Sequence, residues 1–344
     1  MYSRGNKPRI GIDLGGTKTE VIALSAQGET LLRKRAPTPS HSYQNIIRTV
    51  ADLACEARAL IGPVTHVGIG VPGAPDQDSG RMKNANTTCL IGQPLAADLA
   101  SAIGCPVKLE NDANCFALSE AIDGAARKHR VVFGVILGTG VGGGWVVNRE
   151  LHSGIHHIAG EWGHNPVPIR TLSRNAQSDR SFDPQASDVQ SVLHGRLPGA
   201  PFVDLGRACY CGLTDCIETH LCGAGLRRTH AWVYRHSCAN QKNKLKDHET
   251  LSGEQIAQAA QAGDSLCQHT LDLYSRQLAS ALATVINMID PDAIVLGGGV
   301  SNMESLYDRV RLALPDYVFN DRTDTLIVKA MHGDSSGVRG AAWL

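Results

Sequence analysis

Three glycine-rich loops, each directly after an apolar segment of strand length, constrain the fold of this chain more than any other feature. They contain Gly15 and Gly16, a run at 138–144 with five glycines, and a triplet at 297–299. Glycine loses more conformational entropy on ordering than any other residue, so we expect these loops to let the backbone approach a ligand closely. Three such loops at strand ends favour a site for the phosphates of a nucleotide.

The apolar segments around these loops occur in an order that is repeated along the chain. The first half is expected to begin with three strands and to continue with alternating helices and strands, and a similar order restarts at Val131. The predicted strands are 9–14, 20–24, 31–35, 64–71, 107–109, 131–137, 144–147, 293–296 and 326–330, and the predicted helices are 43–60, 95–103, 113–126, 265–289, 302–314 and one from 336. This repetition predicts a duplicated α/β fold with two domains and a cleft between them.

We place the domain boundary near Lys128. The smaller domain is then 1–128, the larger one is 129–335, and the final helix at 336–344 is expected to pack back on the first domain. Residues 170–208 interrupt the larger domain with a polar stretch that has no sustained periodicity. A loop of this length is either an insertion at the surface or a functional lid, and we favour the surface insertion.

Charge and hydropathy exclude several classes of partner. The 344 residues include 33 Lys and Arg against 33 Asp and Glu, so the formal net charge is zero. This balance gives no electrostatic reason to expect nucleic acid or an anionic membrane as a partner. No apolar run approaches the roughly 20 residues that span a bilayer, and the segment 1–8 lacks the apolar core of a signal peptide. We therefore expect a cytoplasmic protein.

The first glycine loop follows an acidic residue at the end of a strand. Its glycines form a tight turn whose N–H groups can hold phosphate oxygens, and a threonine and a lysine add further donors. The pattern is neither a Walker A loop nor a Rossmann fingerprint, and an ordinary hairpin turn is an equally good interpretation. The candidate phosphate-binding residues are Asp13, Gly15, Gly16, Thr17 and Lys18 here, and Thr139, Gly140, Gly297, Gly298 and Gly299 in the other two loops.

Asn111 and Asp112 follow the predicted strand 107–109 and precede a helix. Aspartate is a good N-cap, and on this motif alone a plain cap is the favoured interpretation of Asp112. The functional alternative is a general base at the carboxyl end of a strand, with Asn111 holding the substrate. Transfer of a phosphoryl group to a hydroxyl needs a carboxylate near that hydroxyl to accept its proton.

The most specific pattern is a set of three cysteines with one distant histidine. Cys209, Cys211 and Cys216 lie within eight residues, and His164 precedes them in the chain. Three thiolates and one imidazole suit a tetrahedral structural Zn²⁺, and Gly212 lets the chain turn around the ion. Three buried free thiols are the alternative, but the close spacing makes zinc the preferred interpretation.

Polar residues near this cluster suggest recognition of a polyol. Short stretches of chain tie Glu161 to His164 and Glu218 to Cys216. Carboxylates accept hydrogen bonds from adjacent sugar hydroxyls, although surface carboxylates are the simpler interpretation. The polar run 84–88 either turns the chain or lines a polar pocket.

With these motifs assembled, the chain resembles the ROK family of sugar kinases and repressors over 9–344, outside the insertion. The segment 13–18 resembles the first phosphate loop of the family, 138–142 the second, and 297–299 the adenosine motif. The patterns E-x-G-H at 161–164 and C-x-C-G-x3-C-x-E at 209–218 are similar to the zinc and sugar signature of the family. The resemblance is specific because five motifs occur in the order of the family.

This resemblance implies an actin-like, ribonuclease-H-like fold whose two domains close over ATP and a sugar. It implies transfer of the γ-phosphate of Mg-ATP to the 6-hydroxyl of a hexose, with Asp112 as the base, in a homodimer. It also implies a structural zinc ion on His164, Cys209, Cys211 and Cys216, with His164 serving both metal and sugar. The candidate sugar-binding residues are Gly73, Asn86, Asn111, Asp112, Glu161, His164 and Glu218.

The resemblance to particular ROK kinases is divided. The segments 83–87, 161–166 and 332–340 look like bacterial fructokinase, whereas 111–120 and 137–144 are also similar to N-acetylglucosamine kinase. We expect a fructokinase, with mannose or glucose as further substrates, and keep N-acetylglucosamine kinase as the alternative.

Two interpretations from other classes are disfavoured. A sugar-responsive ROK repressor needs a DNA-binding segment, but only eight residues precede the first predicted strand and no basic face is evident. A non-catalytic sugar or zinc binder would not need Asp13, Asp112 and all three glycine loops, which are present.

Overall fold

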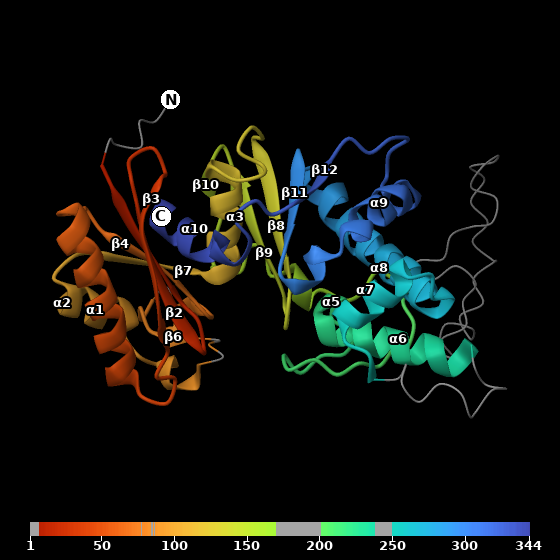
Figure 1. Cartoon of the computed structure of the whole chain (residues 1–344), viewed down its shortest axis with the longest axis horizontal. Helices are drawn as coiled ribbons and strands as arrows, with labels where there is room; N and C mark the ends of the chain where they lie inside the picture. The colour runs from red at the N-terminus through yellow and green to blue at the C-terminus, as the bar shows by residue number, and fades with distance from the viewer. Residues whose placement is uncertain (1–6, 77, 84, 86, 170–200, 238–249) are drawn as a thin grey trace.

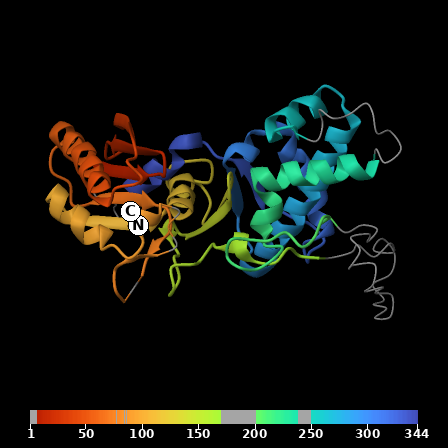
Figure 2. The ribbon, with the colours of Figure 1, turned by 90° about the horizontal axis from the view of Figure 1, so that it is seen from below.

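The computed structural model of the chain describes residues 7–76, 78–83, 85, 87–169, 201–237 and 250–344. The predicted sugar ligand Asn86 and the segment 170–200, which is most of the predicted insertion, lie outside the described residues. The described part is elongated, and its N-terminal and C-terminal sheets lie on either side of two helices (Figure 1; Figure 2).

Two five-stranded sheets with the same topology form the frame of the described residues. Their orders are β3-β2-β1-β4-β7 and β10-β9-β8-β11-β12. In each sheet three antiparallel strands are followed by two strands parallel to the first strand of that meander. The strands are β1 (Arg9–Leu14), β2 (Lys18–Leu24), β3 (Thr30–Pro37), β4 (Val67–Val71), β7 (Val107–Asn111), β8 (Val131–Leu137), β9 (Val141–Val147), β10 (Glu150–Leu151), β11 (Ala293–Gly297) and β12 (Leu326–Lys329), and a small hairpin joins β5 (Ala74–Pro75) to β6 (Met82–Lys83). The predicted duplicated α/β architecture is confirmed.

Two helices cover the outer face of the first sheet. Helix α1 (Tyr43–Ile61) begins after Ser42, whose hydroxyl accepts a hydrogen bond from the Asn45 backbone N–H at 3.4 Å. It ends at Gly62, whose φ of 82° suits glycine. Its apolar residues recur with helical spacing, so one face is buried against the sheet and against helix α2 (Leu95–Ile103).

Helices α3 (Asp112–Ile122) and α10 (Ser336–Trp343) lie between the two sheets (Figure 1). Helix α3 follows β7 of the first sheet but packs on β8 and β9 of the second, whereas α10 comes after β12 of the second sheet and packs on β1 and β4 of the first. The two helices also pack against each other. Each half of the chain therefore contributes one helix that packs on the sheet of the other half. The domain boundary near Lys128 remains a prediction.

Small residues allow this close packing of helices on strands. A Cβ on Gly340 of α10 would collide with the carbonyl oxygen of Cys115 in α3. A Cβ on Gly134 of β8 would lie 2.7 Å from the Cβ of Ala117 in α3. A larger side chain at Gly340 would push α3 away from α10, and one at Gly134 would push it away from β8.

The glycine run at 138–144 is divided between a turn and a strand. Its last three glycines belong to β9, where a Cβ on Gly144 would lie 2.7 Å from the carbonyl oxygen of Ala113 in α3. A Cβ on Gly143 would lie 2.7 Å from the carbonyl oxygen of Gly160. The expectation that the whole run serves a ligand is therefore wrong for these glycines, because they make room for neighbouring backbone.

Two carboxylates hold α10 to α3. Glu120 is completely buried and accepts hydrogen bonds from the hydroxyl of Ser336 at 2.8 Å and from backbone N–H groups just before α10. Asp123 accepts hydrogen bonds from the Arg339 side chain at 2.6 Å and from Trp343 Nε1 at 3.1 Å. Charged hydrogen bonds of this kind are stronger than neutral ones, so the crossing of the two helices is firmly fixed.

The second sheet is covered on its outer side by helices from the middle and end of the chain (Figure 1). The long α8 follows its predicted bounds of 265–289, but α5, α6 and α7 were not predicted, since α5 is only about one turn long and α6 is rich in His and Arg. The bounds are α5 (Ile217–Leu221), α6 (Gly223–Ser237), α7 (Gly253–Gln261), α8 (Ser265–Ile289) and α9 (Glu304–Ala313). None of the helices within the described ranges is long and apolar enough to span a membrane.

The end of the predicted insertion, 201–208, is partly buried, although Gly206 and Ala208 are exposed. Phe202 and Arg207 are buried, and Arg207 donates hydrogen bonds to the carbonyl oxygens of Thr219 at 3.0 Å and Gly225 at 3.2 Å. The expectation of a surface insertion is therefore wrong for the buried residues of this segment, because the buried Arg207 guanidinium ties it to α5 and α6.

Candidate active site

The predicted site residues gather where the parallel strands of the two sheets end. In the first sheet, Asp13 lies near the end of β1, Gly73 follows β4 and Asn111 ends β7. These strands are parallel neighbours, so their carboxyl ends share one edge. In the second sheet the turn 138–140 follows β8, and the turn 297–299 begins at the last residue of β11. These two strands are also parallel neighbours. Ligands of α/β sheets bind outside such edges.

Asn111 and Asp112 are positioned by the start of α3. Asn111 is the N-cap: its Oδ1 accepts a hydrogen bond from the N–H of Ala113 at 2.9 Å, and its Nδ2 donates to the carbonyl oxygen of Gly73 at 3.4 Å. Asp112 is the first helical residue, and its Oδ1 accepts from the same N–H at 2.8 Å. The interpretation of Asp112 as a plain N-cap is therefore wrong, because Asn111 is the N-cap and Asp112 is the next residue.

Two carboxyl groups at this edge have raised pKa values. Asp112 is open to solvent on one side, but the protein around its other sides disfavours the charged form and raises the pKa of its carboxyl. Burial, followed by the charges of Asp112 and Glu20, raises the pKa of Asp13 to about 6. A carboxyl whose pKa is closer to neutral is better suited to accept a proton from a hydroxyl.

Glu161, His164 and Glu218 come to the same site from the second half. Glu161 directly precedes the short helical turn Trp162–His164, and Glu218 lies in the first turn of α5. Burial raises the pKa of the Glu161 carboxyl, His164 lowers it, and Asp112 and Glu218 raise it further. Glu161 therefore lies within reach of the charges of His164, Asp112 and Glu218.

Glu218 is held against the turn between β8 and β9. Its Oε2 accepts a hydrogen bond from the N–H of Val141 at 2.9 Å. A Cβ on Gly140 would collide with that oxygen, so Glu218 reaches the turn only because Gly140 has no side chain. Thr139, at the tip of the turn, is exposed.

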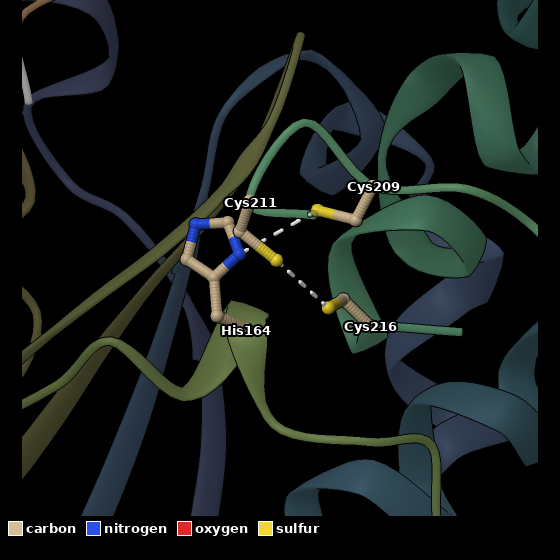
Figure 3. A group of neighbouring side chains, drawn as sticks. All are labelled: His164, Cys209, Cys211 and Cys216. Atoms are coloured by element: carbon tan, nitrogen blue, oxygen red, sulfur yellow. Dashed lines mark hydrogen bonds between the residues drawn. The ribbon is translucent and has the colours of Figure 1, made fainter. Parts of the chain in front are cut away.

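His164, Cys209, Cys211 and Cys216 form a compact set of candidate metal ligands (Figure 3). Their ligand atoms all lie within 4.8 Å of one another. Cys209 Sγ is 3.6 Å from His164 Nδ1, and Cys211 Sγ is 3.6 Å from Cys216 Sγ. Ligand atoms around a tetrahedral zinc ion are about 3.5–3.8 Å apart, whereas a disulfide needs about 2.05 Å. The residues therefore fit a structural zinc ion.

The thiols differ in how readily they lose a proton. A backbone hydrogen bond from Leu213 lowers the pKa of the Cys211 thiol to about 7, which favours the thiolate that a metal binds. Burial raises the pKa values of the Cys209 and Cys216 thiols, so these two would lose their protons only together with metal binding.

The residues that hold the cysteine loop were missed from the sequence. Asp215 accepts hydrogen bonds from the N–H groups of Gly206 at 2.7 Å and Arg207 at 3.0 Å, and it lies 3.0 Å from His220 Nε2. An acidic residue inside a cysteine loop is a signal that could have indicated this role. Nothing in the sequence marks Arg207, because a buried arginine has no recognisable pattern.

Tyr210 is a third missed residue. Its hydroxyl is 2.9 Å from Nε2 of His164, and the two rings are nearly perpendicular with centroids 5.1 Å apart. Because Nδ1 of His164 faces the cysteines, Nε2 is the nitrogen that would carry the proton in a metal-bound imidazole. Tyr210 thus helps to fix the orientation of the imidazole ring, although 79% of the tyrosine is exposed.

A cavity of about 800 Å³ adjoins the glycine turns of the second sheet. Its walls come from the turn after β8, the start of α6, helix α7, the segment after β11 and helix α9. They include Gly138, Gly223, Gln258, Gly299 and Arg309. This size is in the range of ligand pockets. A Cβ on Gly299 would meet no atom of the described part of the chain within 4 Å, so this glycine leaves open space at the cavity.

The other glycines of the nucleotide prediction have different surroundings. A Cβ on Gly297 would lie 2.5 Å from the ring of Phe116, so packing against α3 explains this residue. Gly298 has φ of 83°, which favours glycine at the bend after β11.

The turn between β1 and β2 is closed by its own backbone. The N–H of Gly15 donates to the carbonyl oxygen of Lys18 at 3.0 Å, and the hydroxyl of Thr38 donates to the carbonyl oxygen of Gly15 at 2.8 Å. Gly16, Thr17 and Lys18 are exposed. The geometry is compatible with both interpretations of this motif, the phosphate loop and the ordinary hairpin turn.

Comparison with known proteins assigns the chain to a family. The profile of the ROK family matches residues 9–344. The chain belongs to the ROK family. It is 36% identical over 334 residues to the N-acetyl-D-glucosamine kinase of Yersinia enterocolitica, an alignment that covers 97% of this chain and 98% of that protein. The motif-based assignment to ROK is therefore confirmed, and this relative carries the name of the alternative kinase and not that of fructokinase.

Solved ROK structures share the fold. The ROK hexokinase from Thermus thermophilus matches with a TM-score of 0.74 at 26% identity, over 97% of this chain and 96% of that one. A ROK family glucokinase from Streptomyces griseus, in complex with glucose and AMPPNP, matches with a TM-score of 0.67 at 26% identity, over 97% and 98% of the two chains. The predicted actin-like α/β fold is thereby confirmed.

Proposed function

We propose that this ROK protein is an ATP-dependent sugar kinase that phosphorylates the 6-hydroxyl of N-acetyl-D-glucosamine. The observation that carries the reaction class is the grouping of Asp112 with Glu161, His164 and Glu218 beside the strand ends of the two sheets. The choice of sugar is supported by the similarity to an N-acetyl-D-glucosamine kinase over 97% of the chain. Fructose, the sugar favoured by the sequence motifs, becomes a competing outcome of the test.

Asp112 accepts the proton of the acceptor hydroxyl in this mechanism. Its raised pKa makes the carboxylate a stronger base than a free aspartate. Its Oδ1 is oriented by the N–H of Ala113 at 2.8 Å, so the carboxylate is held in place before the sugar binds. The neighbouring amide of Asn111 is engaged with Gly73 only at 3.4 Å, and its Nδ2 can also donate to a sugar hydroxyl.

The sugar is held from the second half. Glu161 and Glu218 accept hydrogen bonds from ring hydroxyls. Nε2 of His164 donates one when a sugar hydroxyl replaces the Tyr210 hydroxyl as its partner. A zinc ion on His164, Cys209, Cys211 and Cys216 would supply rigid support for the imidazole.

The nucleotide occupies the cavity beside the turns of the second sheet. Gly138 and Gly299 border this cavity, so its walls bring backbone close to a bound ligand. Asp13 is the carboxylate of this chain that would hold Mg²⁺, and oxygen ligands of this kind suit the ion. Magnesium bound to ATP supplies charge neutralisation at the transferring phosphate. The homodimer implied by the family stays a separate proposal, which sedimentation equilibrium would test.

A coupled ADP-release assay with Mg-ATP tests the proposal. N-acetyl-D-glucosamine, glucose, mannose and fructose are compared by kcat/KM, and we expect N-acetyl-D-glucosamine to lead by about 10-fold or more. A preference for fructose would restore the expectation from the sequence and overturn the choice of sugar. Absence of turnover with every sugar would overturn the kinase proposal, and a salt-dependent shift of duplex DNA would then favour a regulator.

A further inference from the structure

Glu110, in β7, is a buried carboxylate that the proposed mechanism does not use. Only 8% of the residue is exposed. Among the described residues, no Lys, Arg or His forms an ion pair with it. A buried carboxylate without a cation is unfavourable unless hydrogen bonds satisfy its oxygens, so its partners indicate what it is for.

Three donors satisfy the Glu110 carboxylate. Its Oε1 accepts hydrogen bonds from the backbone N–H of Asn111 at 2.9 Å and from Nδ2 of Asn114 at 3.0 Å. Its Oε2 accepts one from the hydroxyl of Ser153 at 2.9 Å. The two oxygens therefore contact different parts of the molecule.

The two donors at Oε1 stand on either side of Asp112. Asn111 is the N-cap of α3 and Asn114 lies in its first turn, so Glu110 fixes the turn that carries the candidate base. Ser153, by contrast, follows β10 in the second sheet, and the same segment continues to Glu161. Glu110 thus connects the base of the first half to the sugar-binding segment of the second.

We propose that Glu110 and Ser153 form a positioning pair that sets Asp112 at the correct distance from the bound sugar. The inference rests on the proposed function, because it takes Asp112 as the general base. A base must lie within hydrogen-bond distance of the proton that it accepts, and a displacement of about 1 Å can lower the rate by about 100-fold. The pair touches neither substrate and acts only through Asp112 and the segment 153–161.

The variant Ser153→Ala tests the pair. It removes the hydroxyl that spans the two halves but leaves both bonds between Glu110 and α3. We expect kcat to fall about 10-fold while the KM for the sugar stays within about 2-fold, because the base is displaced and the sugar ligands are kept. A residue that only supports folding would lower the melting temperature and leave kcat unchanged.

Ser119→Ala is the matched control. Ser119 is a completely buried serine of α3 whose hydroxyl has no hydrogen-bond partner among the residues that the structure describes, so its removal perturbs the same helix without breaking a bond seen there. We expect wild-type kcat for this variant. An equal loss of kcat in Ser119→Ala and Ser153→Ala would overturn the proposal, because any loss of packing at α3 would then explain both.

Glu110→Gln and Glu110→Ala separate geometry from charge. The glutamine oxygen can accept the two bonds from α3, and its amide can donate to the Ser153 hydroxyl, so we expect at least about a third of wild-type kcat and an unshifted acidic limb of the pH profile. Glu110→Ala loses all three bonds and is expected to match or exceed the loss in Ser153→Ala. A glutamine variant as impaired as the alanine variant would overturn positioning through hydrogen bonds.

Asp112→Asn, measured in parallel, distinguishes failure of this inference from failure of the proposed function. Wild-type kcat in Ser153→Ala together with an inactive Asp112→Asn would overturn the pair and keep the base. An active Asp112→Asn would overturn the base assignment, and the pair with it.

Discussion

The two sheets have the same topology but carry different chemistry at matching positions. In the first sheet β1 ends close to Asp13, and Asp112 follows β7. In the second sheet β8 and β11 lead into glycines at 138 and 297–299. One edge offers carboxylates, whereas the other offers open space and backbone N–H groups. This difference matches the proposed division of work, in which the first edge accepts the proton and the second holds the nucleotide.

The packing of α3 on the second sheet fixes how the two edges lie relative to each other. Helix α3 begins at the carboxylate edge of the first sheet but rests on β8 and β9 of the second. Asp112 is therefore joined to the first sheet by the chain and to the second sheet by the packing of α3, so its distance from Glu161 depends on that packing. If the comparison is sound, changes at the first edge should affect the chemical step and changes at the second should affect binding.

The largest effect is expected from Asp112→Asn. Loss of a general base costs about 100- to 10,000-fold, so we expect kcat to fall by about 1,000-fold. The Kd for the sugar, measured by calorimetry, should stay within about 3-fold, because the amide keeps the shape of the side chain. Asp52→Asn, an exposed position in α1, should behave as wild type. Retention of more than about a tenth of kcat would remove Asp112 as the base.

Removal of the metal should come next and should act on binding. In Cys211→Ser one of the four candidate ligands is lost, and we expect the KM for the sugar to rise about 10- to 100-fold while the KM for ATP is unchanged. Metal analysis should show loss of zinc from the same variant. Cys55→Ser is the matched control, because Cys55 is also an exposed thiol but lies on α1. An unchanged sugar KM in zinc-free protein would separate the metal from the sugar site.

Local patterns in the sequence predicted much of the fold. The strand 9–14 and the helices 95–103 and 265–289 have the bounds expected from their apolar spacing. The residue types and spacing of the three cysteines and His164 are typical of a zinc site, so the sequence predicts them as a cluster. The structure brings the four side chains together. The strand and the helices depend on residues that are close in the chain, and the metal cluster depends on cysteine and histidine, which are common metal ligands.

Contacts between distant segments could not be predicted in the same way. In the sequence, a glycine that makes room for a helix, such as Gly144, cannot be told from a glycine that makes room for a ligand. The run at 138–144 therefore predicts a ligand site along its whole length. Arg207 and Glu110 are charged residues that are expected at the surface until their buried partners are known. The pair of Glu110 and Ser153 joins two halves that no local pattern relates.

A third prediction concerns stability and depends on pH. Burial raises the pKa of Asp13 to about 6, so the protein stabilises the protonated form. This stabilisation is complete below the unfolded pKa of about 3.9 and is lost as the pH rises through about 6. Asp13→Asn should therefore raise the free energy of unfolding at pH 8 by about 2 kcal/mol and leave it nearly unchanged at pH 4, measured by urea unfolding.

Asp292→Asn is the opposite case at the other end of the strands. The backbone N–H groups of Val131 and Arg130 donate to Asp292 at 2.8 Å, and these bonds lower the pKa of its carboxyl. Its contribution is present above the unfolded pKa and is lost as the pH falls, so this variant should be less stable than wild type at pH 8. If Asp13→Asn also destabilised the protein at pH 8, the carboxylate at the first edge would be a structural group, and the contrast between the two edges would weaken.

The smallest effects should separate two glycines in the turns that follow β8 and β11. A Cβ on Gly140 would displace Glu218 from the N–H of Val141, so Gly140→Ala should raise the KM for the sugar about 5-fold, the value of one hydrogen bond. A Cβ on Gly299 meets no atom but takes up space beside the 800 Å³ cavity, so Gly299→Ala should raise the KM for ATP about 2- to 3-fold and leave the sugar unaffected. The opposite pattern, with Gly140→Ala acting on ATP and Gly299→Ala on the sugar, would exchange the two binding sites. Because both variants add one methyl group in a turn that follows a strand of the second sheet, each is the control for the other.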